Sequence, residues 1–188
     1  MLLLVLVSCG PGYEQEDGNW AWVAYSGTGK FVRSFDPDDA TFEILDNEKY
    51  AKDKDSVYLE GIAIEHADPT TFEVLSENGY SKDKKHVFLG TYIIIFADPE
   101  TFDIIDWPYA RDDKRIFNGN LPMFVDDIKS FQITKEGDDR CASVKFFFIE
   151  VNKDYQWLDT IDVDGIIVGE WAEAKTDTEK FKGFRKVE

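Results

Sequence analysis

The sequence predicts a mainly β protein made of tandem repeats of about thirty residues, each a short helical turn plus a β-hairpin, stacked into one array. The first observation is spacing, because Phe42, Phe72 and Phe102 lie thirty residues apart. The second is that the same register aligns other residues, namely Tyr50, Tyr80 and Tyr109, then Asp53, Asp83 and Asp112, then Val57 with Tyr58, Val87 with Phe88, and Ile116 with Phe117. Because one such unit cannot bury its apolar face alone, we expect each unit to stack on its neighbours.

Each repeat begins with a turn signal and continues into strand formers. Asp68 followed by Pro69 is typical of a helix start, since the carboxylate caps backbone N–H groups and proline suits the first helical position. Residues 80–89 then end in β-branched and aromatic side chains, Gly90 breaks the run, and residues 91–96 resume it. This pattern predicts one helical turn and one hairpin in each unit.

The repeated acidic and basic cluster carries a family resemblance. Asp53–Tyr58 and Asp83–Phe88 both read Asp-Lys-x-x-Val followed by an aromatic residue, and the flanking blocks Ala67–Phe72 and Ala97–Phe102 are close copies. This resembles the DKNYY family of bacterial repeat proteins. The resemblance implies an envelope-associated protein with no established activity. The third copy, Arg111–Arg115, departs from the pattern, so the cluster is not a required site in every unit.

The N-terminus is similar to a bacterial lipoprotein signal. An apolar run leads into Leu-Val-Ser-Cys-Gly, in which Cys9 would become the lipid-bearing first residue. We therefore expect residues 1–8 to be a signal remnant and residues 9–17 a flexible tether. Gly10, rather than an aspartate, follows the cysteine, and by resemblance to the sorting of enterobacterial lipoproteins this favours the outer membrane of the bacterial envelope. The alternative is a buried N-terminal strand.

The remaining residues, 18–188, are expected to form a single β-rich repeat domain. Its clear units are 36–67, 68–97 and 98–126, and degenerate units precede and follow them. The Asp-to-Phe spacing persists in Asp127 with Phe131 and in Asp177 with Phe181. An apolar run at 144–151 predicts a further strand.

The charge balance limits the partners. The chain has 38 acidic and 21 basic residues, for a net charge of −17. Such a balance disfavours nucleic acid and anionic lipid surfaces and favours a basic partner. We expect contact with the membrane through the lipid anchor only. With Cys9 acylated, Cys141 is a lone thiol, so packing must hold the fold.

No motif indicates a cofactor or a metal. Asp53, Asp55 and Asp83 could bind a cation if they stacked, but each has lysine neighbours that would compete with it. We expect exposed ion pairs at a turn instead. The sequence shows no zinc spacing and no dinucleotide fingerprint.

A catalytic role for Cys141 with His66 or His86 stays open, because sequence does not show proximity. A pair of carboxylates is equally open, since some pair among so many will always fit. A core position for Cys141 is the simpler interpretation.

Three tryptophans are candidate binding residues. Trp107, Trp20 and Trp22 could offer amphipathic rings to a peptide or a sugar, although core packing is their default role. Trp107 stands where earlier units carry Lys49 and Gly79, which is a turn position with little structural need for an aromatic ring.

Three classes of function follow. The first is a non-catalytic envelope lipoprotein whose repeat surface binds a protein, peptide or glycan. The second is an acidic immunity or inhibitor protein for a basic toxin. The third is a hydrolase with an unrecognised site. The lipoprotein box and the lack of a catalytic motif favour the first class.

Overall fold

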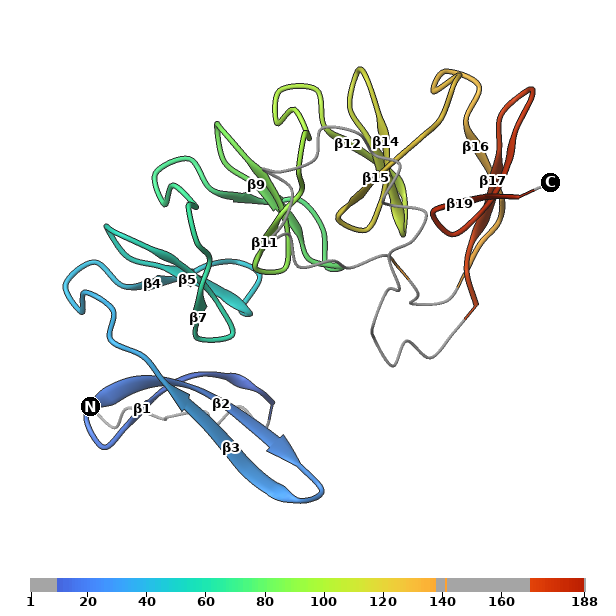
Figure 1. Cartoon of the computed structure of the whole chain (residues 1–188). Coiled ribbons are helices and arrows are strands. Elements are labelled where there is room, and N and C mark those ends of the chain that lie inside the picture. The colour runs from blue at the N-terminus through green and yellow to red at the C-terminus, as the bar shows by residue number, and fades with distance from the viewer. Residues whose placement is uncertain (1–9, 138–140, 142–169, 188) are drawn as a thin grey trace, which may run out of the picture.

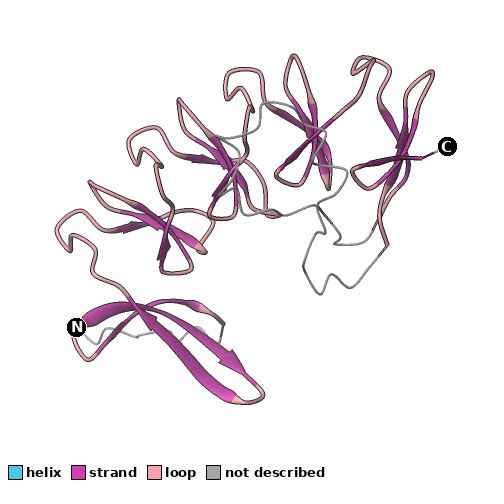
Figure 2. Ribbon diagram, viewed as in Figure 1, coloured by secondary structure: helices cyan, strands magenta, loops and turns pink. Residues whose placement is uncertain are grey.

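The computed structural model describes residues 10–137, 141 and 170–187. These residues form a mainly β structure of small antiparallel sheets, without a helix in the described part (Figures 1 and 2). Accordingly, none of the described segments is a helix that could cross a membrane. Cys9 and the strand expected at 144–151 lie outside the described residues.

In the described part of the chain, five sheets follow one another, each with its strands in sequence order. The N-terminal sheet has β1 (Gly12–Glu16), β2 (Asn19–Ser26) and β3 (Gly29–Ser34). Sheet I has β4 (Glu43–Ile44), β5 (Tyr50–Lys52), β6 (Val57–Leu59) and β7 (Ile62–Ala63). Sheet II has β8 (Glu73–Val74), β9 (Tyr80–Lys82), β10 (Val87–Leu89) and β11 (Tyr92–Ile93). Sheet III has β12 (Asp103–Asp106), β13 (Tyr109–Arg111), β14 (Ile116–Asn118) and β15 (Leu121–Met123). Sheet IV has β16 (Gln132–Lys135), β17 (Glu173–Lys175), β18 (Lys180–Lys182) and β19 (Arg185–Val187).

The predicted helical turn is wrong. At Asp68 the chain makes a β-turn, in which the Thr71 N–H donates to the Asp68 carbonyl at 3.1 Å. The Asp68 carboxylate accepts from the N–H of Thr70 at 3.0 Å, as Asp side chains commonly do within turns. A helix cannot continue from this turn, because Glu73, two residues after Thr71, already pairs with Lys82 in sheet II.

The prediction of one hairpin in each unit is also incomplete, because each of sheets I to III has four antiparallel strands that pair in sequence order. Residues 80–89, expected as one strand, are β9 and β10, which pair with each other. The reversal lies at the Asp-Lys cluster, where the Asp83 N–H donates to the carbonyl of His86 at 2.9 Å. The flexible tether expected at residues 9–17 is not what the structure shows, because Gly12–Glu16 forms β1 and Tyr13 is buried.

The core consists of apolar clusters that lie between neighbouring sheets. One cluster joins Tyr80 and Val87 of sheet II to Ala110 and Phe117 of sheet III, and others join each remaining pair of consecutive sheets. The N- and C-terminal ends of the described chain lie at opposite ends of this series (Figure 1).

The repeated phenylalanine bridges two units. Phe102 lies 5.6 Å from Tyr80 of the preceding sheet and 5.9 Å from Phe117 of its own, measured between ring centroids. Phe72 makes the corresponding contacts with Tyr50 and Phe88, at 5.8 and 6.2 Å. Their equivalent positions agree with the spacing in the sequence. Phe102 is buried, whereas Phe42 and Phe72 are half-buried.

Candidate functional site

The repeated aspartates are buried hydrogen-bond acceptors within the fold. Asp83 Oδ1 accepts from the N–H groups of Lys85 and His86, both at 2.7 Å, and its Oδ2 accepts from the N–H of Asp68 at 2.9 Å. Asp53 and Asp112 make the equivalent bonds. Burial alone would raise the pKa of Asp83, but these N–H groups outweigh it and the pKa lies below its ordinary value. The expectation of exposed ion pairs at Asp53 and Asp83 is therefore wrong.

The lysines of the motif also serve the fold. Lys84 Nζ lies 2.8 Å from the Asp68 carboxylate, and this ion pair, together with the bonds from Thr70, holds the pKa of Asp68 well below its usual range. Lys82 Nζ donates to the carbonyl of Pro99 in the next unit at 3.2 Å. One unit earlier, Lys54 forms the equivalent ion pair with Asp38, and Lys52 donates to the carbonyl of Pro69.

Sheet IV has no aspartate at the position of Asp53, Asp83 and Asp112, and two other residues accept the equivalent backbone hydrogen bonds. Thr176 Oγ1 accepts from the N–H of Glu179 at 3.0 Å, and Glu179 Oε2 accepts from the N–H of Asp126 at 3.0 Å. Asp177 corresponds to Asp113, because both donate their N–H to the hydroxyl of the preceding turn. Its spacing to Phe181 therefore does not mark the start of a repeat.

A ladder of tyrosines connects consecutive sheets. Each hydroxyl lies within hydrogen-bonding distance of the backbone carbonyl that precedes the first inner strand of the next sheet: Tyr13 of Lys49 at 3.0 Å, Tyr50 of Gly79 at 3.3 Å, Tyr80 of Pro108 at 3.0 Å and Tyr109 of Ala172 at 3.2 Å. The Tyr80 and Tyr109 hydroxyls also lie 3.1 Å and 2.7 Å from the carbonyls of Gly119 and Gly183 in the same next sheet. Glu173 stands at the next tyrosine position by strand register, so the ladder ends at sheet IV.

The ladder predicts sensitivity to alkali. Burial raises the pKa of Tyr13 and of Tyr50 from 10.0 to about 12. Because the unfolded chain ionises first, the contribution of these tyrosines to stability should be constant below pH 10 and be lost as the pH rises from 10 to about 12. Urea unfolding across this range tests the prediction, and Tyr50→Phe should reduce the slope. Stability that is unchanged up to pH 12 would contradict it.

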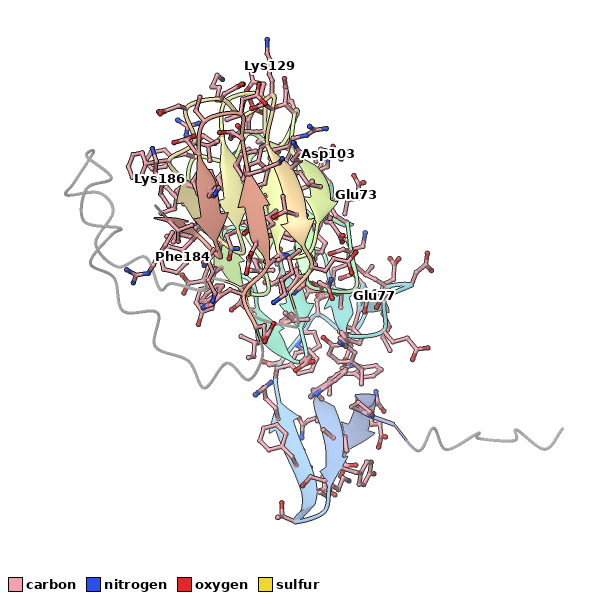
Figure 3. All side chains as sticks on the ribbon, turned by 90° about the vertical axis from the view of Figure 1, so that its right-hand side faces the viewer. Glu73, Glu77, Asp103, Lys129, Phe184 and Lys186 are labelled. Carbon is pink, nitrogen blue, oxygen red and sulfur yellow. The ribbon has the colours of Figure 1, made fainter. Side chains whose placement is uncertain are left out.

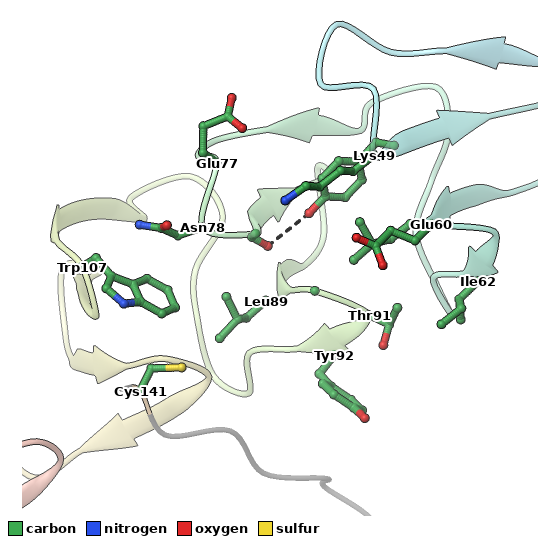
Figure 4. Close-up of a pocket in the computed structure, with 14 residues that line it drawn as sticks. Lys49, Glu60, Ile62, Glu77, Asn78, Leu89, Thr91, Tyr92, Trp107 and Cys141 are labelled. Carbon is green, nitrogen blue, oxygen red and sulfur yellow. Dashed lines mark hydrogen bonds between the residues drawn. The ribbon is translucent and has the colours of Figure 1, made fainter. Parts of the chain in front are cut away.

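A surface groove of about 460 Å³ runs across sheets I, II and III (Figure 4). Its lining comprises Lys49, Tyr50, Leu59, Glu60, Ile62, Glu77, Asn78, Gly79, Leu89, Gly90, Thr91, Tyr92, Trp107 and Cys141. Trp107 and Cys141 lie at one end and Ile62 at the other, with Leu89 and Tyr92 between them. The groove thus combines an apolar lining with amide, hydroxyl, carboxylate and ammonium groups.

Trp107 is the candidate residue that reaches the groove. Its half-buried ring lies 5.8 Å from that of Tyr80 in an edge-on arrangement. In the ladder, the accepting carbonyls belong to Lys49, Gly79 and Pro108, so Pro108 is the residue of sheet III that is equivalent to Lys49 and Gly79. Trp107 therefore corresponds to Asn78, which corrects the alignment made from the sequence.

Trp20 and Trp22 lie in the apolar cluster between the N-terminal sheet and sheet I. Trp22 is buried, with its ring 5.0 Å from that of Tyr13. Trp20 is half-buried, 4.4 Å from the ring of Phe42. Neither is among the residues that line the groove. Their positions match the packing role that the sequence analysis took as the default.

The structure does not bring Cys141 and a histidine together in the groove. Cys141 is half-buried, and burial raises the pKa of its thiol to about 11, so it stays protonated at neutral pH. His66 and His86 lie beside each other, 6.4 Å apart between ring centroids, and neither is among the groove residues. In the described part of the chain, no group of three or more His, Cys, Asp or Glu side chains could hold a metal ion.

Sequence reasoning missed two features of the site. One is the burial of Asp83, and the other is that Leu89 and Tyr92 line the groove. Sequence contains a signal for the first, because the aspartate recurs at a fixed place between two strands. It contains none for the groove, whose residues differ from unit to unit. Glu60, for example, stands where sheet II has Gly90, because both donate their N–H to the carbonyl before the first inner strand.

The fold and site define a β repeat protein whose motif residues serve the fold and whose groove lies across three units. The sequence profile of the DKNYY family matches residues 23–156, and the chain belongs to this family. Neither a curated protein nor a solved structure gives a significant match.

Proposed function

We propose that this chain is a non-catalytic binding protein of the bacterial envelope, and that its groove receives a segment of a partner protein. One observation carries the proposal: the groove crosses three sheets and is lined largely by residues that the repeated motif leaves variable. At the position of Asn78, sheet III has Trp107, and at the position of Tyr92, sheet I has Ile62. Within the groove, Tyr50 belongs to the repeated motif and Leu59 is equivalent to Leu89, whereas most of the other lining residues differ between units.

The proposal includes one continuous stacked array. Its support is the tyrosine ladder, together with the apolar clusters that lie between each pair of consecutive sheets. Lys52 and Lys82 add a further bond between units. An array presents an extended surface, which repeat proteins commonly use to bind partners.

A basic protein or peptide is the partner that the charges favour. The net charge of −17 attracts basic groups at long range. Within the groove, the ring of Trp107 offers stacking area, and the carboxylates of Glu60 and Glu77 can accept hydrogen bonds. Lys49 opposes a cation close to it, so a cationic side chain fits best at the Trp107 end.

Comparing capture by three proteins tests this function. Wild type and a Trp107→Ala, Tyr92→Ala variant would be used to isolate partners from envelope extract, with Tyr25→Ala as the control, because Tyr25 is 54% exposed outside the groove. We expect the groove variant to lose a salt-sensitive protein partner that the control retains. Equal capture by all three would refute the groove, and turnover of a bound molecule would refute a purely binding role. If the wild type instead captured a glycan that stayed bound at high salt, the partner would be a glycan and the proposal of a protein partner would be wrong.

We further propose lipid attachment at Cys9 and an outer-membrane location, supported by the sequence around this residue. In cells that make the full precursor, Cys9→Ser should abolish labelling by a fatty-acid probe and release the protein from membranes. The matched control is Cys141→Ser, which should retain labelling. Labelling that persists in Cys9→Ser would exclude this anchor.

A further inference from the structure

Sheet IV presents a face on which most side chains are cationic. This terminal face consists of Glu173, Lys175, Lys180, Lys182, Arg185 and Val187, which the strand register places on one side of β17, β18 and β19. Ala174 and Phe181 point to the opposite side, into the cluster shared with sheet III. All four cations are exposed. Figure 3 looks onto sheet IV, which lies nearest the viewer.

The register shows what these residues replace. Lys180 stands where sheet III has Ile116, and Arg185 stands where it has Leu121. Ile116 is buried against sheet IV, and Leu121 is buried as well. At these two positions, cations therefore replace residues that are apolar and buried in the preceding sheet, whereas Lys175 stands where sheet III has the exposed Arg111 and Lys182 where it has Asn118. Sheet IV is the last sheet of the series among the described residues, and the cations on its terminal face are exposed.

The sign of the charge needs a second explanation. A terminal unit requires only hydrophilic residues on its outer face, and carboxylates would meet that need. Acidic residues outnumber basic ones in the whole chain by 38 to 21, yet four cations and one anion, Glu173, give the terminal face a charge of +3. The composition as a whole disfavours anionic surfaces, and this face departs from that composition.

We propose that the terminal face docks on an anionic phospholipid bilayer. The cations lie on adjacent strands about 5 Å apart and on alternate residues about 7 Å apart, close enough to engage neighbouring headgroups together. At one edge of the sheet, Arg185 lies over the ring of Phe184, which contacts Trp171 at 5.6 Å between centroids. Tryptophan side chains favour the membrane interface, whereas Phe184 also packs against the cluster shared with sheet III.

The position of the face at one end of the protein makes the contact compatible with the acidic remainder. Charges separated by more than a Debye length, about 8 Å at physiological ionic strength, are largely screened from each other. Sheets I and II, which contain many of the carboxylates, lie beyond sheet III from this face (Figure 1). The bilayer therefore interacts mainly with the cations of sheet IV. This contact is independent of the groove.

Vesicle binding tests the proposal with the full chain. Binding to vesicles of phosphatidylcholine alone would be compared with binding to vesicles containing phosphatidylglycerol, so that the apolar N-terminus contributes equally to both. The face variant is Lys175→Gln, Lys180→Gln, Lys182→Gln. The control is Lys85→Gln, Lys114→Gln, Lys129→Gln, which removes the same charge from exposed lysines elsewhere. Trp107→Ala should bind vesicles as the wild type does.

The wild type should prefer anionic vesicles, and the preference should fall by about fivefold for each cation removed, or about two orders of magnitude in the face variant. The control should keep the preference, which should disappear in high salt. An equal preference in wild type and face variant would overturn the proposal. So would salt-sensitive self-association in sedimentation experiments without vesicles that the face variant loses, because the occupant would then be a second copy of this chain.

Discussion

Asp83→Ala should lower the free energy of unfolding by about 3–5 kcal/mol, because it removes an acceptor that three backbone N–H groups share. Each of these bonds involves a charged acceptor, and alanine leaves the donors without a partner in a part-buried site. The loss should reach beyond the turn itself, since the Asp68 N–H belongs to the loop that begins the same unit. Urea unfolding measures the effect.

Two further variants show whether the acceptor is the cause. Asp83→Asn keeps an oxygen in the same place and should cost less than alanine. Asp55→Ala removes a carboxylate that is two residues from Asp53 but 73% exposed, and should change the stability by less than about 0.5 kcal/mol. If Asp83→Ala were as mild as Asp55→Ala, the aspartate would not hold the turn.

Phe102→Ala should cost about 3–5 kcal/mol, because the ring is buried between two sheets and its removal leaves a cavity. Thermal and urea unfolding measure the loss. Phe31→Ala is the control, since Phe31 is 50% exposed on β3 and should be nearly neutral. A loss no larger in Phe102→Ala than in Phe31→Ala would show that the repeated phenylalanine does not hold neighbouring units together.

Much of the fold could be predicted from the periodic residues. The recurrence of Phe72 and Tyr80 indicated equivalent positions, and Gly90 marked a real reversal between β10 and β11. The helical turn at Asp68 failed because Pro69 after an acidic residue suits a β-turn as well as a helix start. What decides between them is the pairing of Glu73 with Lys82, nine residues further along the chain, which makes the segment after the turn a strand.

The candidate site was less predictable. Trp107 was singled out for an aromatic ring at a turn, and it does line the groove. Trp20 and Trp22 carry the same side chain, but the pairing of β1 with β2 places them in a cluster with Phe42. The charge of the terminal face could not be seen from composition, because an average over the chain conceals which side of a strand a lysine occupies.

The most direct test of the stacked array is amide hydrogen exchange in Phe102→Leu. If the sheets depend on each other, weakening one contact between sheets should speed exchange on both of its sides, at the Gly90 N–H that donates to Gly79 and at the Gly119 N–H that donates to Pro108. The N-terminal sheet should be much less affected. Exchange that accelerates in sheet III alone, with sheet II unchanged, would contradict the array.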